Sequence, residues 1–467
     1  MASTADEAEL DVDVVVLGAG PAGENVAQYA TEDTELTCAL VEGELVGGEC
    51  SYYACMPSKA LLRPLEIAAT AGQLGGLRRP EVDVAGVLAR RDYWVSRYDD
   101  AGQIAWAEST GLQVVRGHGR LAGERLVVVG DQRLRARHAV VIGTGSVPVI
   151  PPVYAQVSPW TSRDATGVVE IPQRLVVVGG GVVACEAATW LAGLGSAVTM
   201  LVRGDRLLPG QEPFAGEAVL AALTAAGVTV HRQTDVQACR RESPRETGLG
   251  RIHGGPLTMQ TSAGPIVADE ILVAVGRRPR LRDLGLESVG LTPDDVLAGR
   301  LPDWLSAVGD ASGEPALTHW GKYRARVLGE QIAAAALGRA ASPEVEAPVP
   351  QVIFTDPQVA AVGLTQESAR SSGLDIAIAR VPYASAAGAA LLRDEVPGTA
   401  QLVVDRASGA VVGATFVGPD AGELVHAATV AIVTGAPVRL LRHAVPSYPT
   451  ASELWLRLLE DLPRDLR

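Results

Sequence analysis

Two cysteines five positions apart, Cys50 and Cys55, are the residues of this chain best suited to chemistry. A cysteine thiolate is both a nucleophile and a redox group. Lys59 follows Cys55 by four positions, after Pro57 and Ser58, and only one other lysine stands among the 40 basic residues. Arginine fills nearly every other basic position of this chain. A lysine at position 59 therefore indicates a site that needs a compact ammonium group.

The other three cysteines, Cys38, Cys185 and Cys239, lie in apolar segments typical of buried, inert thiols. An odd cysteine count with an acidic, polar N-terminus predicts a cytoplasmic protein without a signal peptide, in which a disulfide is usually catalytic or redox-sensing. No apolar run of about 18 residues occurs, so we expect no membrane span. The net charge of −14 argues against nucleic acid as a partner. No metal site is expected.

A strand, a turn, a helix and a second strand open the chain. The turn reads G-x-G-x-x-G and the second strand ends in an acid. Glycines let the backbone approach a pyrophosphate at the helix N-terminus, and the acid accepts hydrogen bonds from a ribose. The predicted elements are a strand at 13–17, a helix at 24–30 and a strand at 36–41. The pattern predicts a dinucleotide site formed by Gly18, Gly20, Gly23 and Glu42.

A second unit of the same kind begins with a strand at 174–178, and its turn carries Gly179 and Gly181. Ala184 stands where the third glycine is usual, and the next strand is followed by Arg203 and Arg206 instead of an acid. Arginines attract the 2′-phosphate that an acid repels, so this unit is predicted to prefer NADPH, with NADH possible. The alternative is that both arginines are solvated surface charges.

Further motifs follow in order along the chain, and the whole set resembles the FAD-dependent pyridine nucleotide-disulfide oxidoreductases. This family includes dihydrolipoamide dehydrogenase, glutathione reductase and mercuric reductase. The likeness extends from about Val12 to Glu460. Besides the two glycine turns, it rests on the segments 47–59, 142–146, 275–279, 308–310, 317–319, 354–357 and 417–424.

The resemblance implies an α/β protein with two Rossmann-like dinucleotide-binding domains plus a C-terminal α+β dimerisation domain. The expected domains are an FAD-binding domain in two parts, 1–148 and 274–345, an NAD(P)H-binding domain at 149–273, and an interface domain at 346–467. The last domain should contain strands and two helices. A homodimer with an active site shared across the interface is expected.

The family pattern also implies roles for single residues. Cys50 and Cys55 would form a redox-active disulfide, with Cys55 on the flavin side and Cys50 as the nucleophile whose pKa must be depressed. Lys59 would pair with Glu186 near flavin N5, where a fixed positive charge favours hydride transfer. The remaining implied cofactor contacts are Thr144, Gly145 and Asp310 for FAD, and Gly276 in the Val275–Pro279 motif.

The spacing of the cysteines predicts an irregular backbone between them. In a regular helix, residues five apart lie about 7.5 Å apart along the axis and point in different directions, which is too far for a disulfide. Glycines before the pair and Pro57 after it permit a distorted turn. Tyr52 and Tyr53 lie in this turn. They either shape an aromatic acceptor pocket or pack beneath the loop.

One motif departs from the family near the C-terminus. Disulfide-reducing members carry His-Pro-Thr-x-x-Glu, whereas here Tyr448 occupies the His position and Glu453 is kept. A phenol has a pKa near 10, against about 6.5 for imidazole, so it is a poor general base at neutral pH. His443 is expected to be an ordinary surface or helix-end histidine. No cysteine follows Cys239, which argues against efficient mercury detoxification.

Three hypotheses follow for the function. The first is an NADPH-dependent FAD flavoprotein oxidoreductase that reduces a non-standard small-molecule acceptor, such as a quinone, a soft metal ion or a specialised disulfide. The second is a conventional dihydrolipoamide dehydrogenase or low-molecular-weight disulfide reductase, in which Tyr448 or a water replaces the histidine. The third is a redox-sensing flavoprotein with little turnover.

Overall fold

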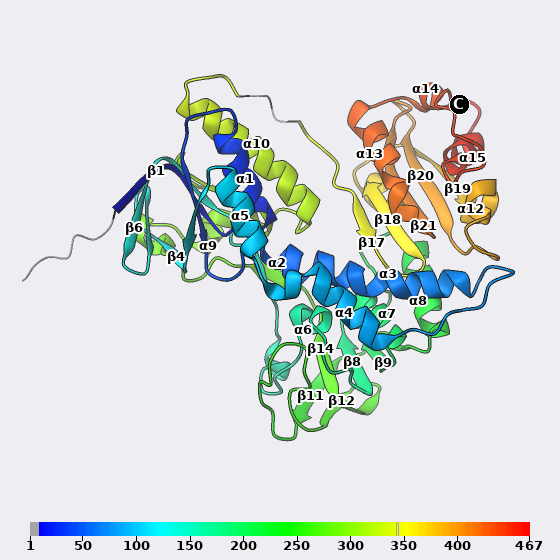
Figure 1. Cartoon of the computed structure of the whole chain (residues 1–467). Coiled ribbons are helices and arrows are strands. Elements are labelled where there is room, and N and C mark those ends of the chain that lie inside the picture. The colour runs from blue at the N-terminus through cyan, green and yellow to red at the C-terminus, as the bar shows by residue number, and fades with distance from the viewer. Residues whose placement is uncertain (1–8, 342, 344) are drawn as a thin grey trace, which may run out of the picture. The chain divides into compact units, whose positions relative to one another are not determined.

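The computed structural model describes residues 9–341, 343 and 345–467. These residues form two compact units, each assembled from segments that are distant in the sequence (Figure 1). The first unit contains the described residues up to Pro57, together with Asp92–Pro148 and Arg277–Val345. The second contains Ser58–Arg91, Val149–Gly276 and Glu346–Arg467.

The first unit is built on a seven-stranded sheet with the order β3-β2-β1-β6-β5-β4, in which β16 also pairs with β6. The pairs among β1, β2, β3, β6 and β16 are parallel, whereas β4–β5 and β5–β6 are antiparallel. A separate two-stranded sheet pairs β7 with β15. The strands are β1 (Glu9–Leu17), β2 (Cys38–Glu42), β3 (Gln113–Arg116), β4 (Gly119–Gly123), β5 (Leu126–Val129), β6 (Gln132–Ile142), β7 (Ser146–Pro148), β15 (Arg277–Pro279) and β16 (Leu305–Ala307).

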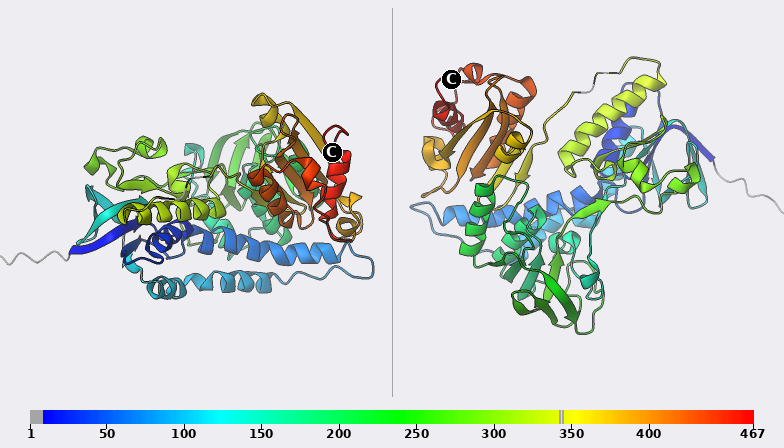
Figure 2. Two further views of the ribbon diagram at one scale, coloured as in Figure 1. Left: turned by 90° about the horizontal axis from the view of Figure 1, so that it is seen from above. Right: turned by 180° about the vertical axis from the view of Figure 1, so that it is seen from behind.

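Successive side chains of a strand point to opposite faces of the sheet. In this sheet the side chains on both faces are buried. Val14 and Val16 of β1 join one core with α1 (Pro21–Thr31) and α10 (Thr318–Ala336). Val15 and Leu17 join the core on the opposite face. Helices α1 and α10 lie side by side in every view (Figures 1 and 2), and Gly329 of α10 permits this because a Cβ there would lie 2.8 Å from Cβ of Tyr29.

The second unit contains a parallel sheet of order β10-β9-β8-β14 and an antiparallel sheet of order β11-β12-β13. Near-continuous apolar sequence such as β8 is expected for parallel strands that are covered on both faces. The strands are β8 (Arg174–Val178), β9 (Ala197–Leu201), β10 (Thr229–His231), β11 (Val236–Arg241), β12 (Leu257–Thr261), β13 (Gly264–Ala268) and β14 (Glu270–Val273).

The C-terminal part of the second unit is an antiparallel sheet of order β17-β18-β21-β20-β19. Helix α13 contacts β18 and β21, and α15 contacts β19 and β20. The strands are β17 (Gln351–Ile353), β18 (Gln358–Gly363), β19 (Ile376–Pro382), β20 (Thr399–Asp405) and β21 (Val411–Gly418).

The prediction of two helices in this last region is wrong. Five α-helices occur among its described residues, and three of them span six residues or fewer, which is too short for a helical periodicity to be seen in the sequence. They are α11 (Gln366–Ser371), α12 (Ala387–Ala390), α13 (Val425–Thr434), α14 (Val438–Leu441) and α15 (Glu453–Asp461).

Both nucleotide-binding patterns fold as strand, helix and strand, and the first helix begins earlier than predicted. Helix α1 begins at Pro21, since proline is favoured at the first helical position. The other α-helices are α2 (Gly48–Tyr52), α3 (Cys55–Ala71), α4 (Val84–Trp94), α5 (Ala101–Ser109), α6 (Ser162–Thr166), α7 (Val182–Gly193), α8 (Pro213–Ala225) and α9 (Pro293–Leu297). None of the described helices is both long and apolar enough to cross a membrane.

Candidate active site

The parallel strands of the first unit gather the residues predicted to bind FAD at one edge of the sheet. The glycine turn follows β1, Glu42 ends β2, Thr144 and Gly145 follow β6, and Asp310 follows β16. Since neighbouring parallel strands end at the same edge, these four groups are brought together from segments far apart in the chain. In doubly wound sheets this edge is where ligands bind.

The first glycine turn has the shape that a dinucleotide requires. Gly18 has φ +101°, and a Cβ there would lie 2.4 Å from the carbonyl oxygen of Gly143. A Cβ on Gly23 would lie 1.9 Å from the carbonyl oxygen of Gly18. At Gly20 the nearest atom to an added Cβ lies 3.9 Å away, which leaves space at the N-terminus of α1 for a phosphate. Glu42 accepts a hydrogen bond of 2.8 Å from the backbone N–H of Ala19. The turn therefore fits the ADP part of FAD.

The residues after β6 and β16 are joined to one another. The hydroxyl of Ser146 donates a hydrogen bond to the carboxylate of Asp310. Arg277 donates to the Ser146 hydroxyl at 2.8 Å and to Glu49 at 3.2 Å. Thr144 donates at 2.6 Å to the carbonyl of Arg280. Ser146, Arg277 and Glu49 were not predicted as site residues, although each lies within or beside a family motif.

The second glycine turn lies in the second unit, between β8 and α7. Gly179 has φ +130°, and a Cβ there would lie 2.3 Å from the carbonyl oxygen of Ala274. An added Cβ on Gly181 or Gly276 meets nothing within 4 Å, so both leave open space. Arg203 is exposed after β9, and Arg206 donates a hydrogen bond of 2.9 Å to the carbonyl of Pro209.

The helical backbone is interrupted between the two cysteines. Helix α2 ends at Tyr52 and α3 begins at Cys55, so the pair spans a break. Gly47 and Gly48 precede the break with φ of 105° and 62°, which favour glycine. The distorted turn expected from the cysteine spacing is present.

The two thiols lie in contact, and neither is disulfide-bonded in the structure. Sγ of Cys55 lies 3.3 Å from the hydroxyl of Thr318, the first residue of α10. The hydrogen bond with Cys55, together with burial, raises the pKa of Cys50 above its usual range. This is the reverse of the depressed pKa that attack by Cys50 requires, because each thiol in this dithiol form lies beside a second sulfur rather than a cation. Thr318 was missed as a sulfur contact because no sequence signal links it to Cys55.

Lys59 and Glu186 form an ion pair within the second unit. Nζ of Lys59 lies 2.8 Å from Oε2 and 3.1 Å from Oε1 of Glu186. The carboxylate is 4% exposed on α7 and also accepts a hydrogen bond of 2.9 Å from the backbone N–H of Phe354. The Lys59 ammonium lies 4.5 Å from the centre of the Phe354 ring. The side chains of Glu186 and Phe354 hold this ammonium in place within the second unit.

Tyr448, which the sequence predicts to stand in place of the family histidine, is 76% exposed. Glu453, five residues later, is buried, and one of its oxygens accepts a hydrogen bond of 3.2 Å from Arg457. The other oxygen, Oε2, is buried without a hydrogen-bond partner among the described residues. His443 is exposed just after α14. One oxygen of Glu453, the predicted orienting acid, can therefore accept a further hydrogen bond.

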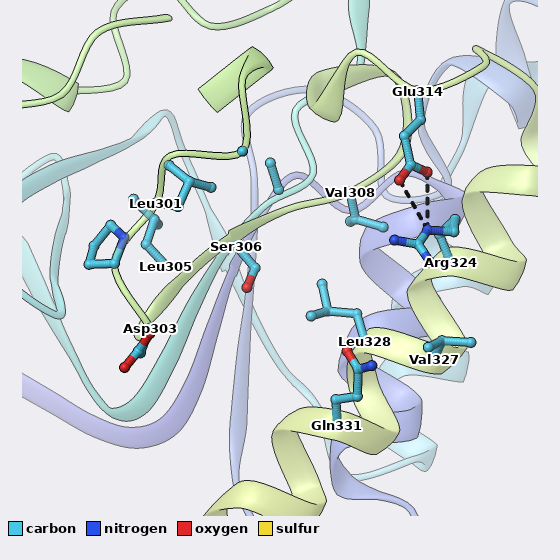
Figure 3. Close-up of a pocket in the computed structure, with 13 residues that line it drawn as sticks. Leu301, Asp303, Leu305, Ser306, Val308, Glu314, Arg324, Val327, Leu328 and Gln331 are labelled. Atoms are coloured by element: carbon cyan, nitrogen blue, oxygen red, sulfur yellow. Dashed lines mark hydrogen bonds and ion pairs between the residues drawn. The ribbon is translucent and has the colours of Figure 1, made fainter. Parts of the chain in front are cut away.

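A cavity of about 310 Å³ lies elsewhere in the first unit, between the β16 region and α10 (Figure 3). Glu314 and Arg324 form an ion pair of 3.0 Å in its wall. No predicted site residue lines it. In the part of the chain that the structure describes, no group of three or more His, Cys, Asp or Glu side chains could hold a metal ion.

The fold and the site define a flavoprotein disulfide oxidoreductase. The family profile described as pyridine nucleotide-disulphide oxidoreductase matches residues 12–323, and the profile of its dimerisation domain matches residues 349–458. The chain belongs to the pyridine nucleotide-disulphide oxidoreductase family.

Relatives of known name include "Dihydrolipoyl dehydrogenase 3" of Pseudomonas aeruginosa, which is 34% identical over 94% of this chain and 96% of its own length. "Mercuric reductase" of Staphylococcus aureus is 30% identical over 95% of this chain and 81% of its own length. Among solved structures, the HOCl-induced flavoprotein disulfide reductase RclA from Escherichia coli has a TM-score of 0.82 at 22% identity, covering 96% of this chain and 99% of its own. LpdA from Mycobacterium tuberculosis has a TM-score of 0.81 at 24% identity, with coverage of 96% and 99%.

These matches confirm the predicted family, the α/β fold class with its C-terminal dimerisation domain, and the prediction of an oxidoreductase. The family depends on FAD and uses NADH or NADPH. At these identities the solved structures show a shared fold.

Proposed function

We propose that this protein is an NADPH-dependent FAD flavoprotein reductase that uses a Cys50–Cys55 redox disulfide to reduce a non-standard acceptor. The observation that carries the proposal is the contact between the two thiols at the break between α2 and α3. Each thiol gives up one electron and one proton when the pair closes to a disulfide, so the pair supplies two of each to an acceptor.

FAD, when bound, accepts a hydride from a nicotinamide and passes electrons to a disulfide. In this proposal Gly18, Gly20, Gly23 and Glu42 bind its ADP part, and Thr144, Gly145 and Asp310 bind near its flavin end. Lys59 supplies a positive charge that Glu186 fixes, since the carboxylate is buried and bonded to both the ammonium and the chain. The corresponding domains are 1–148 and 274–345 for FAD, 149–273 for NAD(P)H and 346–467 for the dimer interface.

The proposal of a non-standard acceptor depends on Tyr448 and Glu453. Oxidation of a dithiol such as dihydrolipoamide needs a general base, and protonation of ordinary leaving thiols needs a general acid. An exposed phenol supplies neither efficiently at neutral pH, and Glu453 has no imidazole to orient. Acceptors that need no such group are a quinone, a soft metal ion or a specialised disulfide.

The preference for NADPH is proposed from Arg203 and Arg206, which follow β9 where an acid would select NADH. Gly181 and Gly276 leave the space in which the nicotinamide dinucleotide would bind, and Gly179 permits the close approach of the turn to the carbonyl of Ala274. A homodimer is supported by the match to the dimerisation domain, and Tyr448 and Glu453 would serve the partner's cysteines. We also propose that the protein is located in the cytoplasm.

A second candidate is a conventional dihydrolipoamide dehydrogenase, which is favoured by the names of several relatives. The two candidates differ in the acceptor alone, so one experiment separates them. The purified holoenzyme is reduced anaerobically with NADPH and offered lipoamide, glutathione disulfide, a quinone and Hg²⁺ in parallel. Fast turnover of the quinone or metal with slow lipoamide turnover supports the proposal. Fast lipoamide turnover in both directions would overturn it.

A further inference from the structure

Two tyrosine rings from separate segments of the first unit stack beside the cysteine turn. Tyr53 is one of the two residues that separate α2 from α3, between Cys50 and Cys55. Its ring lies 5.4 Å from the ring of Tyr98, with 27° between the planes. The Tyr52 ring lies 6.4 Å from Tyr53 at 57°. Three rings therefore form one continuous group at the redox turn.

The backbone that presents Tyr98 has an unusual conformation. Ser96, Arg97 and Tyr98 have φ of 48°, 52° and 61°, so three consecutive residues other than glycine are left-handed. Side chains with a Cβ rarely adopt this conformation, and it persists only where the surroundings impose it. Such strain is concentrated at functional sites.

Contacts at both ends hold the turn in place. The backbone N–H of Tyr98 donates to the carbonyl of Val95 at 2.8 Å, and Val95 is 1% exposed. After the turn, the carboxylate of Asp100 accepts a hydrogen bond of 2.7 Å from the backbone N–H of Val46. Asp100 also forms an ion pair with Arg116. The backbone on both sides of Tyr98 is thus held in place, by the turn itself and by Asp100.

The three rings differ in their exposure. Tyr52 is 3% exposed, and its ring lies 3.0 Å from the position of a Cβ on Gly47, so it packs beneath the loop. Burial raises the pKa of Tyr52 to about 12, so this phenol stays neutral. Tyr53 and Tyr98 are only half-buried. The sequence left open whether Tyr52 and Tyr53 shape an acceptor pocket or pack beneath the loop. In the structure Tyr52 packs beneath the loop, whereas Tyr53 is part of the accessible surface.

We propose that the stacked pair Tyr53–Tyr98 is the acceptor-binding platform of this enzyme, and that it takes a flat ring such as a quinone. This inference rests on the proposed function, in which the cysteine thiols are the reductant. Aromatic faces attract flat rings through offset stacking, and they offer neither a charge for a metal ion nor a hydrogen-bonding frame for a peptide disulfide. Two thiols close to a disulfide and give two electrons and two protons, which convert a quinone to a hydroquinone. NADPH supplies the electrons for the next turnover.

The test compares the Michaelis constants of the holoenzyme for menadione and for hydroxyethyl disulfide. Tyr98→Leu removes one ring of the stack and should raise the ratio of the menadione constant to the disulfide constant by about 2- to 12-fold, which corresponds to about 0.5–1.5 kcal/mol of stacking. Tyr98→Phe keeps the ring and should leave the ratio near that of the parent protein. The matched control is Tyr93→Leu, which removes a 73% exposed ring of the same segment that lies outside the stack.

A binding measurement separates failure of this inference from failure of the proposed function. Equilibrium dialysis with naphthol, a flat ring that the enzyme cannot reduce, should show weaker binding after Tyr98→Leu and unchanged binding after Tyr93→Leu. If the parent protein binds naphthol through Tyr98 but reduces no quinone, the platform stands and the proposed function is wrong. If Tyr98→Leu changes neither the ratio nor naphthol binding, the platform is overturned. Should Tyr98→Leu fail to fold, Tyr53→Leu with Tyr53→Phe decides by the same two measurements.

Discussion

If the proposed function is correct, replacing Tyr448 with histidine should allow this protein to oxidise dithiols efficiently. Glu453 is buried, and its Oε2 has no hydrogen-bond partner among the described residues. A buried carboxylate oxygen without a donor is costly, so a histidine placed five residues upstream meets an acceptor that is already prepared. We expect Tyr448→His to increase the rate of dihydrolipoamide oxidation.

The size of the effect follows from the surroundings of both side chains. Tyr448 is 76% exposed, so its loss should change the free energy of unfolding by no more than about 0.5 kcal/mol. A hydrogen bond to a charged acceptor contributes about 1.5–3 kcal/mol, which is enough to draw the imidazole towards Glu453. A positioned general base contributes roughly 10²–10⁴ in rate. Because the imidazole must leave an exposed position, we expect the lower end, about 10²-fold.

The assay is steady-state oxidation of dihydrolipoamide as a function of pH. Neutral imidazole is the base, so the rate of Tyr448→His should rise as the pH passes the ordinary imidazole pKa of about 6.5. The matched control Tyr448→Phe should show neither the gain nor the pH dependence, and Glu453→Gln in the histidine variant should remove most of the gain. If Tyr448→His is no faster than Tyr448→Phe at any pH, Glu453 does not serve this position.

Three further predictions concern other parts of the site. Arg203→Glu should shift the preference from NADPH towards NADH, measured as the ratio of kcat/KM for the two cofactors, because an acid repels the 2′-phosphate. Lys59→Met should lower the free energy of unfolding by on the order of 1–3 kcal/mol in denaturant titrations, because it leaves Glu186 buried with only the Phe354 N–H as partner. Burial raises the pKa of Glu24 to about 7, above the ordinary value near 4.5, so the folded state holds the proton more tightly. The stability from this group is fully present below about pH 4.5 and is lost as the pH rises towards 7, by on the order of 3 kcal/mol, and Glu24→Gln should flatten that slope.

Each of these predictions has a control on an exposed residue with a side chain of the same charge. Arg370→Glu should leave cofactor preference unchanged, and an equal shift would mean that net charge, not the 2′-phosphate, is responsible. Arg63→Met lies on the same helix as Lys59 and should change stability by no more than about 0.5 kcal/mol. Glu35→Gln should retain the pH slope of the parent protein. If the pH dependence of stability is unchanged in Glu24→Gln, other titrating groups are responsible for it.

The parts of the fold that depend on local pattern were predictable from the sequence. The apolar strand 174–178 and the glycines beside it indicate a parallel sheet and a nucleotide turn, because few other structures use that combination. The spacing of Cys50 and Cys55 also indicated a break in the helix, since a regular helix separates them too far. The family and the α/β class, which rest on many such motifs in order, are confirmed.

The parts that depend on contacts between distant segments were not predictable. No residue near Ser96–Tyr98 signals a left-handed turn, because such a turn normally needs glycine or asparagine and this one has neither. The contact between Cys55 and Thr318 joins segments that only the folded sheet and α10 bring together. The expected depression of the Cys50 pKa was wrong for the dithiol form, because the sequence does not show that each thiol is hydrogen-bonded to the other.

Anaerobic titration of the holoenzyme with NADPH tests the central claim most directly. If Cys50 and Cys55 are a redox couple in contact with the flavin, the parent protein should take up more than one hydride equivalent per flavin and develop a long-wavelength charge-transfer band. The variant Cys50→Ser should take up one equivalent. Uptake of a single equivalent by the parent protein, equal to that of Cys50→Ser, would contradict the account.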